Sequence, residues 1–204
     1  RPGPYGWYQA VNTRLNMCLE RGAFRRTGFV VAVSEVVAHQ LRDVAPGNVP
    51  VGVIPNGVDT DVFRPGEEDR SALGLPEGRT LALFVGDAKS PRKNLDGVLR
   101  ALPRVPELHL AVAGDSRGGP YRRLAHSLQL DERVHFLGLR SDVPEILAGA
   151  DILLLSSISE GIPLTLIEGM AAGLPIVSTN VGGIPEVVTD QLHGFLSPSE
   201  DYQG

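Results

Sequence analysis

The sequence of 204 residues has little of several residue types, and each shortage excludes a class of protein. Its one cysteine, Cys18, excludes an internal disulfide framework and a zinc site built on cysteines. The five histidines stand far apart, without the spacing of a metal-binding motif. Aromatic residues make up only 5%, which leaves a core of Leu, Val, Ile and Ala. No apolar run approaches the roughly 20 residues of a membrane-spanning helix.

The charge balance is mildly acidic, with a net charge of −5, and gives no reason to expect nucleic acid as a partner. The arginines Arg21, Arg25 and Arg26 leave open a peripheral contact with an anionic membrane, against the alternative of a solvated helix end. Without a signal-like segment at Arg1, a cytoplasmic protein is favoured, with membrane association as the alternative. Both ends look cut, so we expect a fragment.

Short runs of Val, Ile and Leu predict the strands. The expected strands are 29–33, 51–54, 81–85, 108–113, 134–137, 151–155 and 176–178. Most of these runs are apolar throughout, without the alternation of a half-exposed strand. Strands of this kind are buried on both faces, which indicates a parallel sheet covered by helices on each side.

Segments with helical periodicity stand between the strands. The expected helices are 35–44, with Ser34 as N-cap, then 94–102, 121–130, 143–148, 163–172 and 184–188. From residue 80 onward strands and helices alternate, which is typical of a doubly wound α/β fold. The turn-rich stretch 54–66 predicts a domain boundary, and the residues before it are the remnant of a second α/β domain.

Ligands of such sheets bind beyond the carboxyl ends of the strands, and the loop 86–94 (GDAKSPRKN) stands at one of these ends. It opens a helix and holds Lys89, Arg92 and Lys93, a combination suited to phosphate. The alternative is a solvated basic loop.

Two glutamates stand eight residues apart, Glu160 in a loop and Glu168 on the following helix. Helical spacing puts Glu168 on one stripe with Leu164, Ile167 and Ala171, which we expect to face the sheet. Because a buried carboxylate needs partners, two interpretations remain open. Glu168 pairs with an Arg or Lys for structure, or it accepts hydrogen bonds from a ligand diol such as a ribose.

Several familiar ligand motifs are absent. The glycines in 114–119 (GDSRGG) have the wrong spacing for a dinucleotide motif, so a nicotinamide cofactor is not expected. The sequence also has no Walker A motif, no G-x-S-x-G elbow and no aromatic-and-basic pattern for nucleic acid.

The run 159–188 (SEGIPLTLIEGMAAGLPIVSTNVGGIPEVV) resembles the retaining family 4 glycosyltransferases, which have the GT-B fold. Glu160 and Glu168 match their E-x7-E motif. Three further segments agree in the expected order: 54–65 (IPNGVDTDVFRP), 84–95 (FVGDAKSPRKNL), and 134–138 (VHFLG) with the Ala-Asp pair that follows at 150–151. The resemblance covers about residues 30 to 197.

The resemblance implies two Rossmann-like domains. Residues 1–54 would be the C-terminal remnant of the acceptor domain, 55–66 the interdomain connection, and 67–204 the donor-binding domain, truncated at its C-terminus. The implied donor substrate is a nucleoside diphosphate sugar, with no cofactor and no metal. The acceptor would be a glycan, a lipid or a small molecule, and the sequence does not name it.

Site residues follow from the same resemblance. Glu160 would contact the hydroxyls of the donor sugar and is the candidate catalytic residue. Glu168 would hold the ribose hydroxyls. The other donor-binding residues implied are Lys93 and Arg92 with Gly86 in the phosphate loop, Gly161, Leu164 and Thr165 near the diphosphate, and Leu139 and Arg140 beside the base.

The sequence departs from the family at Asp87, where an Arg usually follows the loop glycine. Either Arg92 or Lys89 would then supply the second cation, or the site would bind the diphosphate more weakly. The activity implied is transfer of a sugar to an acceptor hydroxyl with retention of anomeric configuration. One alternative is a nucleotide-sugar-binding module without transfer activity. Another is a GT-B-type sugar-nucleotide epimerase, against which the E-x7-E motif argues.

Overall fold

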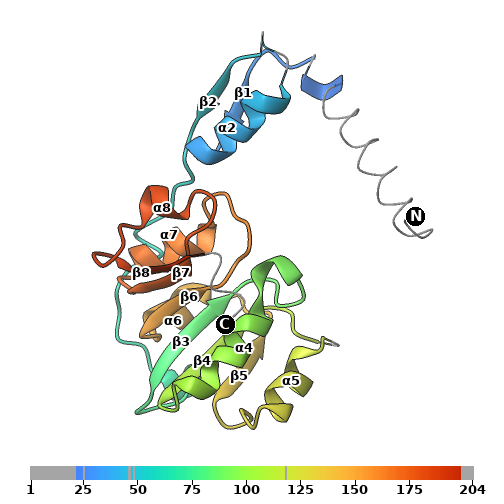
Figure 1. Cartoon of the computed structure of the whole chain (residues 1–204). Helices are drawn as coiled ribbons and strands as arrows, with labels where there is room; N and C mark the ends of the chain where they lie inside the picture. The colour runs from blue at the N-terminus through green and yellow to red at the C-terminus, as the bar shows by residue number, and fades with distance from the viewer. Residues whose placement is uncertain (1–21, 25, 46, 48, 118, 199–204) are drawn as a thin grey trace, which may run out of the picture. The chain divides into compact units, whose positions relative to one another are not determined.

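The computed structural model in Figure 1 describes residues 22–24, 26–45, 47, 49–117 and 119–198. Cys18, Arg21 and Arg25 lie outside the described residues. The chain divides into two compact units, Arg1–Pro55 and Asn56–Gly204. The division falls at the start of the stretch for which a domain boundary was predicted.

The smaller unit contains one strand–helix–strand crossover. Its elements are β1 (Val30–Ala32), α2 (Glu35–Val44) and β2 (Val51–Val53). The strands pair in parallel, with Val30 opposite Val51. Ser34 caps the helix, because its hydroxyl accepts a hydrogen bond from the amide of Val37 at 3.2 Å. The unit is α/β, as the sequence predicts.

The larger unit contains a six-stranded sheet in the order β5-β4-β3-β6-β7-β8, and every pairing is parallel. Its strands are β3 (Thr80–Val85), β4 (Leu108–Ala113), β5 (Val134–Gly138), β6 (Ile152–Leu155), β7 (Ile176–Thr179) and β8 (Gly194–Ser197). Its α-helices are α3 (Arg70–Leu73), α4 (Leu95–Ala101), α5 (Tyr121–Ser127), α6 (Val143–Ala148), α7 (Leu164–Ala171) and α8 (Ile184–Val187), with the 3₁₀ turns η1 (Pro91–Lys93) and η2 (Leu102–Arg104).

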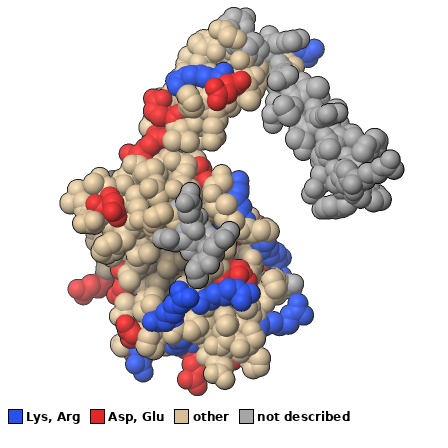
Figure 2. Space-filling model, viewed as in Figure 1, with Lys and Arg blue, Asp and Glu red and all other residues tan. Residues whose placement is uncertain are grey.

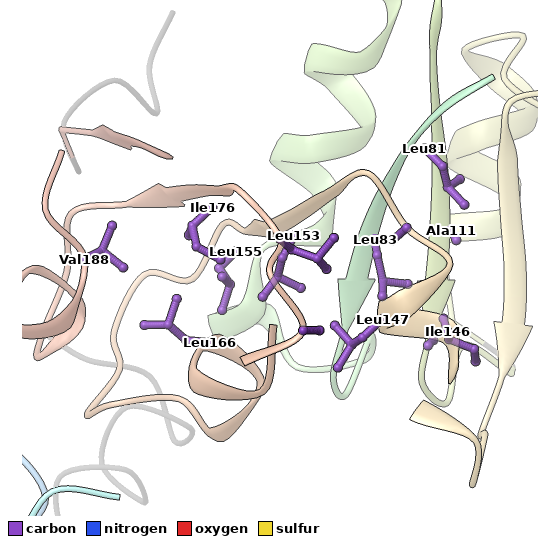
Figure 3. Close-up of a cluster of buried hydrophobic side chains, with 14 of the residues drawn as sticks. Leu81, Leu83, Ala111, Ile146, Leu147, Leu153, Leu155, Leu166, Ile176 and Val188 are labelled. Carbon is purple, nitrogen blue, oxygen red and sulfur yellow. The ribbon is translucent and has the colours of Figure 1, made fainter. Parts of the chain in front are cut away.

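Helices cover both faces of this sheet, and the alternating residues of β3 point into two separate cores. Leu81 and Leu83 pack in the core that includes residues of α6, α7 and α8, part of which Figure 3 shows. Ala82 and Phe84 pack in the core that includes residues of α4 and α5. Strands buried on both faces explain the continuous apolar runs, and the predicted doubly wound α/β class is confirmed.

The strand order reverses between β3 and β6, which are neighbours in the sheet. From β3 the chain proceeds outward through β4 and β5, and it then returns to β6 on the other side of β3. At such a topological switch point, the loops leaving the two strands diverge and open a crevice for a ligand. The two loops concerned are those after Val85 and after Leu155.

Besides the 3₁₀ turns, the described residues include an α-helix, α3, and a strand, β8, that the sequence pattern did not predict. Each has only four residues, too short for a periodicity to be recognised. The helix predicted at 121–130 ends at Ser127 because Gln129 adopts a left-handed conformation, with φ of 58°.

The predicted sheet-facing stripe of α7 was wrong. Its buried residues are Leu166 and Gly169, whereas Leu164 is 54% exposed and Glu168 is half-buried. Gly169 lies so close to β6 that a Cβ atom there would collide with the side chain of Leu153. The backbone thus approaches the sheet on the glycine side of the helix, which a count of apolar residues does not reveal.

Candidate active site at the switch point

The loops after β3 and β6 are joined by hydrogen bonds. The amide of Ile158 donates to the carbonyl of Arg92 at 2.8 Å. The hydroxyl of Ser156 donates to the carbonyl of Lys93, also at 2.8 Å. These bonds tie the basic loop to the loop that holds Glu160.

Lys93 and Glu160 form an ion pair at this junction, with Nζ of Lys93 2.7 Å from Oε1 of Glu160. Their side chains are only 18% and 10% exposed. The stem of Lys93 passes beside Gly86, where a Cβ atom would lie 3.5 Å from Cε of the lysine. The structure therefore brings together three predicted site residues from the two loops. A pair so poorly solvated depends strongly on each partner remaining charged.

The backbone of Glu160 is held by the loop after β7. Gly182 has φ of 57°, and a Cβ atom there would collide with the carbonyl of Glu160. The neighbouring amide of Gly183 donates to the carbonyl of Gly161 at 2.9 Å. Close approach of the two loops thus requires glycine at position 182.

Helix α7 begins directly after this loop. Its N-cap is Pro163, and no side chain caps its first turn. Leu164 and Thr165 occupy that turn, and the Thr165 hydroxyl is buried without a hydrogen-bond partner among the described residues. Uncapped amides and a buried hydroxyl at a helix N-terminus are groups that an anionic ligand can satisfy.

The Glu168 carboxyl lies half-buried on the same helix, and burial raises its pKa above the ordinary value. Within the described ranges its side chain forms no ion pair and no hydrogen bond. Of the two interpretations drawn from the sequence, a structural pair with Arg or Lys is therefore not formed there. The carboxylate remains available to donors from outside the chain.

A pocket of about 500 Å³ lies at the carboxyl ends of β3, β4 and β5. Gly86, Leu139 and Arg140 line it, together with Val85, Asp87, Lys89, Ala113, Gly114, Asp115 and Val143. Leu139 is 70% exposed. Arg140 is fixed by Asp142, with 2.7 Å between Nε and Oδ1, and this contact raises the pKa of the guanidinium. Gly86 belongs both to this pocket and to the group around Lys93.

The loop that departs from the family pattern is organised by aspartates. Asp87 turns the chain by accepting the amide of Lys89 at 3.0 Å. Nζ of Lys89 lies 2.7 Å from Asp115, which also pairs with Arg117 at 3.1 Å. The hydrogen bond from Lys89, followed by those from Arg117, holds the pKa of Asp115 well below its usual range. Of the two candidate second cations, Lys89 is thus already paired.

Arg92 is exposed, and its side chain has no ion pair or hydrogen bond within the part of the chain that the structure describes. Asp115 was not among the predicted site residues. The sequence could have indicated it, because Asp115 comes two residues after the end of β4, at the same edge of the sheet as Asp87.

Basic and acidic side chains are mixed on the face seen in Figure 2. Arg100 and Asp96 of α4 show how such charges pair, with 2.7 Å between Nε and Oδ2. Among the described residues, no group of three or more His, Cys, Asp or Glu side chains is placed to hold a metal ion. None of the described helices is long and apolar enough to cross a membrane.

The fold is that of a GT-B glycosyltransferase. The family model described as "Glycosyl transferases group 1" matches residues 66–204, and the model described as "Glycosyltransferase Family 4" matches residues 2–62. The chain belongs to the group 1 glycosyl transferases, and the resemblance drawn from its motifs is confirmed.

One curated relative is a D-inositol 3-phosphate glycosyltransferase of Mycobacterium tuberculosis, 38% identical over 156 residues, which make up 72% of this chain and 32% of the relative. Among solved structures, sucrose-phosphate synthase of Thermosynechococcus elongatus is 26% identical, with a TM-score of 0.84 over 93% of this chain and 50% of that one. Anabaena HepE in complex with UDP and glucose is 25% identical, with a TM-score of 0.80 over 91% and 54%. The chain spans about a third of the curated relatives' length.

Proposed function

We propose that this protein transfers a sugar from a nucleoside diphosphate sugar to an acceptor hydroxyl, with retention of anomeric configuration. The observation that carries the proposal is the half-buried ion pair of Lys93 and Glu160 at the switch point, beside the uncapped N-terminus of α7. The HepE structure named above was solved with UDP and glucose, which supports a donor of this class.

The departing diphosphate needs positive charge as the bond to the sugar breaks. Lys93, the amides of Leu164 and Thr165, and the Thr165 hydroxyl would supply it, with Arg92 as the second cation. No metal and no cofactor enters this scheme. A diphosphate that binds the Lys93 ammonium group also breaks its ion pair with Glu160. The Glu160 carboxylate would then accept hydrogen bonds from the hydroxyls of the donor sugar.

The rest of the donor has a place in the same crevice. Glu168 would accept the two ribose hydroxyls, which offer the hydrogen-bond donors that its carboxylate lacks. The base would enter the pocket between Leu139 and Arg140, where an exposed apolar side chain stands next to a fixed guanidinium. Gly86 and Gly161 would let the backbone approach the phosphates and the sugar.

In this proposal the acceptor is a glycan, a lipid or a small molecule. The protein would act in the cytoplasm, with or without peripheral contact with a membrane. The second candidate is a nucleotide-sugar-binding module without transfer activity. One observation favours it: all the residues proposed to bind the donor lie within the single unit Asn56–Gly204.

A thermal-shift screen of UDP-, GDP- and ADP-sugars tests the donor assignment, because a bound ligand raises the melting temperature by mass action. We expect one nucleotide class to stabilise the wild type and the control Glu132→Ala, an exposed glutamate, but not Glu168→Ala. Equal shifts in all three proteins would contradict the site. Release of nucleoside diphosphate with a mixed set of acceptors then separates transferase from binding module, and the anomeric configuration of the product tests retention.

A further inference from the structure

The loop 156–163, which carries Glu160, is held by segments that are remote in the sequence. The hydroxyl of Thr179 donates to the carbonyl of Ser157 at 2.6 Å. On another side, the amide of Gly183 bonds the carbonyl of Gly161. A third contact comes from Asn56, whose Nδ2 donates to the carbonyl of Ile162 at 2.8 Å across 106 residues. Asn56 is the first residue of the larger unit.

The carbonyl of Ile162 needs this partner. Ile162 is 5% exposed, and the residue after it, Pro163, is the N-cap of α7. A carbonyl ahead of the N-cap lies outside the hydrogen-bonding pattern of the helix, and the residue before a proline is kept extended. A carbonyl removed from water without a donor destabilises the fold, so the Asn56 amide satisfies a group that the helix cannot.

We propose that Asn56 is a positioning residue for the donor site, an inference that rests on the function proposed above. The peptide that it holds lies two residues after Glu160 and two residues before Leu164. Fixing this peptide therefore fixes both the carboxylate that would meet the sugar and the amides that would meet the diphosphate. Asn56 itself touches neither.

The chemistry of the contact selects the test. A carbonyl only accepts hydrogen bonds, so the contact needs the amide nitrogen. Asn56→Asp keeps the shape of the side chain but sets an oxygen against the Ile162 oxygen. Asn56→Ser keeps a donor on a shorter side chain and is the milder variant if the first fails to fold. Thr60→Ala is the matched control, because Thr60 is exposed in the same connecting segment.

Two measurements on the 204-residue chain decide the question: hydrogen exchange of the amides in 157–168, and calorimetry with UDP, GDP and ADP well below the melting temperature. We expect Asn56→Asp to speed hydrogen exchange in this segment and to lower the affinity for the nucleotide about fivefold, the equivalent of about 1 kcal/mol. Asn56→Ser should change the exchange rates and the affinity in the same direction but by less, and Thr60→Ala should change neither quantity.

Unchanged exchange in 157–168 would overturn the inference. A lower melting temperature with wild-type nucleotide affinity would overturn it too, because a purely structural role moves stability alone. Failure of the proposed function has a different signature, since the wild type would then bind none of the three nucleotides. The exchange measurement would still decide whether Asn56 orders the loop.

Discussion

Nζ of Lys93 and Oε1 of Glu160 lie 2.7 Å apart, so the cation proposed for the diphosphate and the carboxylate proposed for the sugar neutralise each other in the unliganded chain. A diphosphate must compete with Glu160 for Lys93. The two partners of one ion pair should therefore affect nucleotide binding in opposite directions.

We expect Lys93→Met to weaken UDP binding about 10-fold or more, because hydrogen bonds to charged groups contribute about 1.5–3 kcal/mol. Glu160→Gln should leave UDP binding unchanged or tighten it up to about fivefold, because it removes the competitor of the diphosphate. Calorimetry measures both affinities, with UDP or with whichever of GDP and ADP the thermal-shift screen selects. The control for a lost positive charge is Arg123→Met, because Arg123 is an exposed residue of α5. Equal weakening by both substitutions would show that the pair is structural.

Glu168 should lower the stability of the unliganded fold near neutral pH. Burial raises the pKa of its carboxyl, so the folded state binds the proton more tightly than the unfolded state does. Its contribution is most favourable at low pH and is lost as the pH rises through the folded pKa. We expect Glu168→Gln to raise the melting temperature at pH 7 and to gain little at pH 4, while nucleotide affinity falls.

Glu132→Gln, at an exposed position, is the control for this pH comparison. A melting temperature that falls with Glu168→Gln at pH 7 would indicate that the ionised carboxylate stabilises the fold, against the prediction.

Gly182 should tolerate no Cβ atom, because its neighbour is the carbonyl of Glu160. Gly78 is a matched control: its φ is 62° against 57° for Gly182, but nothing lies within 4 Å of its Cβ position. Gly78→Ala should cost about 1–2 kcal/mol of unfolding free energy, the penalty of the left-handed conformation alone. Gly182→Ala should cost clearly more and also weaken nucleotide binding. Equal costs in denaturant unfolding would refute the close approach.

Two histidines, one on β4 and one on the edge strand β5, should make stability depend on pH. Nδ1 of His109 and Nε2 of His135 lie 3.2 Å apart, in rings 11° from parallel. Burial lowers the pKa of both, and for His109 the charges of Arg79 and Arg133 add to this effect. The unfolded state then binds more protons, so stability is full above about pH 6.5 and falls on acidification.

Melting temperatures between pH 8 and pH 5 measure this dependence. His135→Phe should flatten the profile, whereas the exposed His39→Phe, on α2 in the smaller unit, should leave it unchanged. Profiles of the same slope in the wild type and His135→Phe would contradict the assignment.

Local patterns were enough to predict most of the fold. The apolar runs of β3 and β4 indicated parallel strands buried on both faces, and Ser34 predicted the start of α2 at the residue where it begins. Elements of four residues, α3 and β8, gave no periodic signal. The predicted orientation of α7 was wrong for another reason. Gly169 sets how closely that helix approaches Leu153, and a pattern of apolar side chains does not show which way a glycine faces.

By itself, the sequence determined the α/β class, the family, and the two loops that hold Lys93 and Glu160. Those properties depend on short-range order along the chain: strand composition, helix caps and the spacing of Glu160 and Glu168. The tertiary structure decided which groups meet. It paired Lys93 with Glu160, tied Lys89 to Asp115, left Glu168 without a partner among the described residues, and put Asn56 on the carbonyl of Ile162. These contacts join residues 26 to 106 positions apart, whose meeting depends on strand order and register.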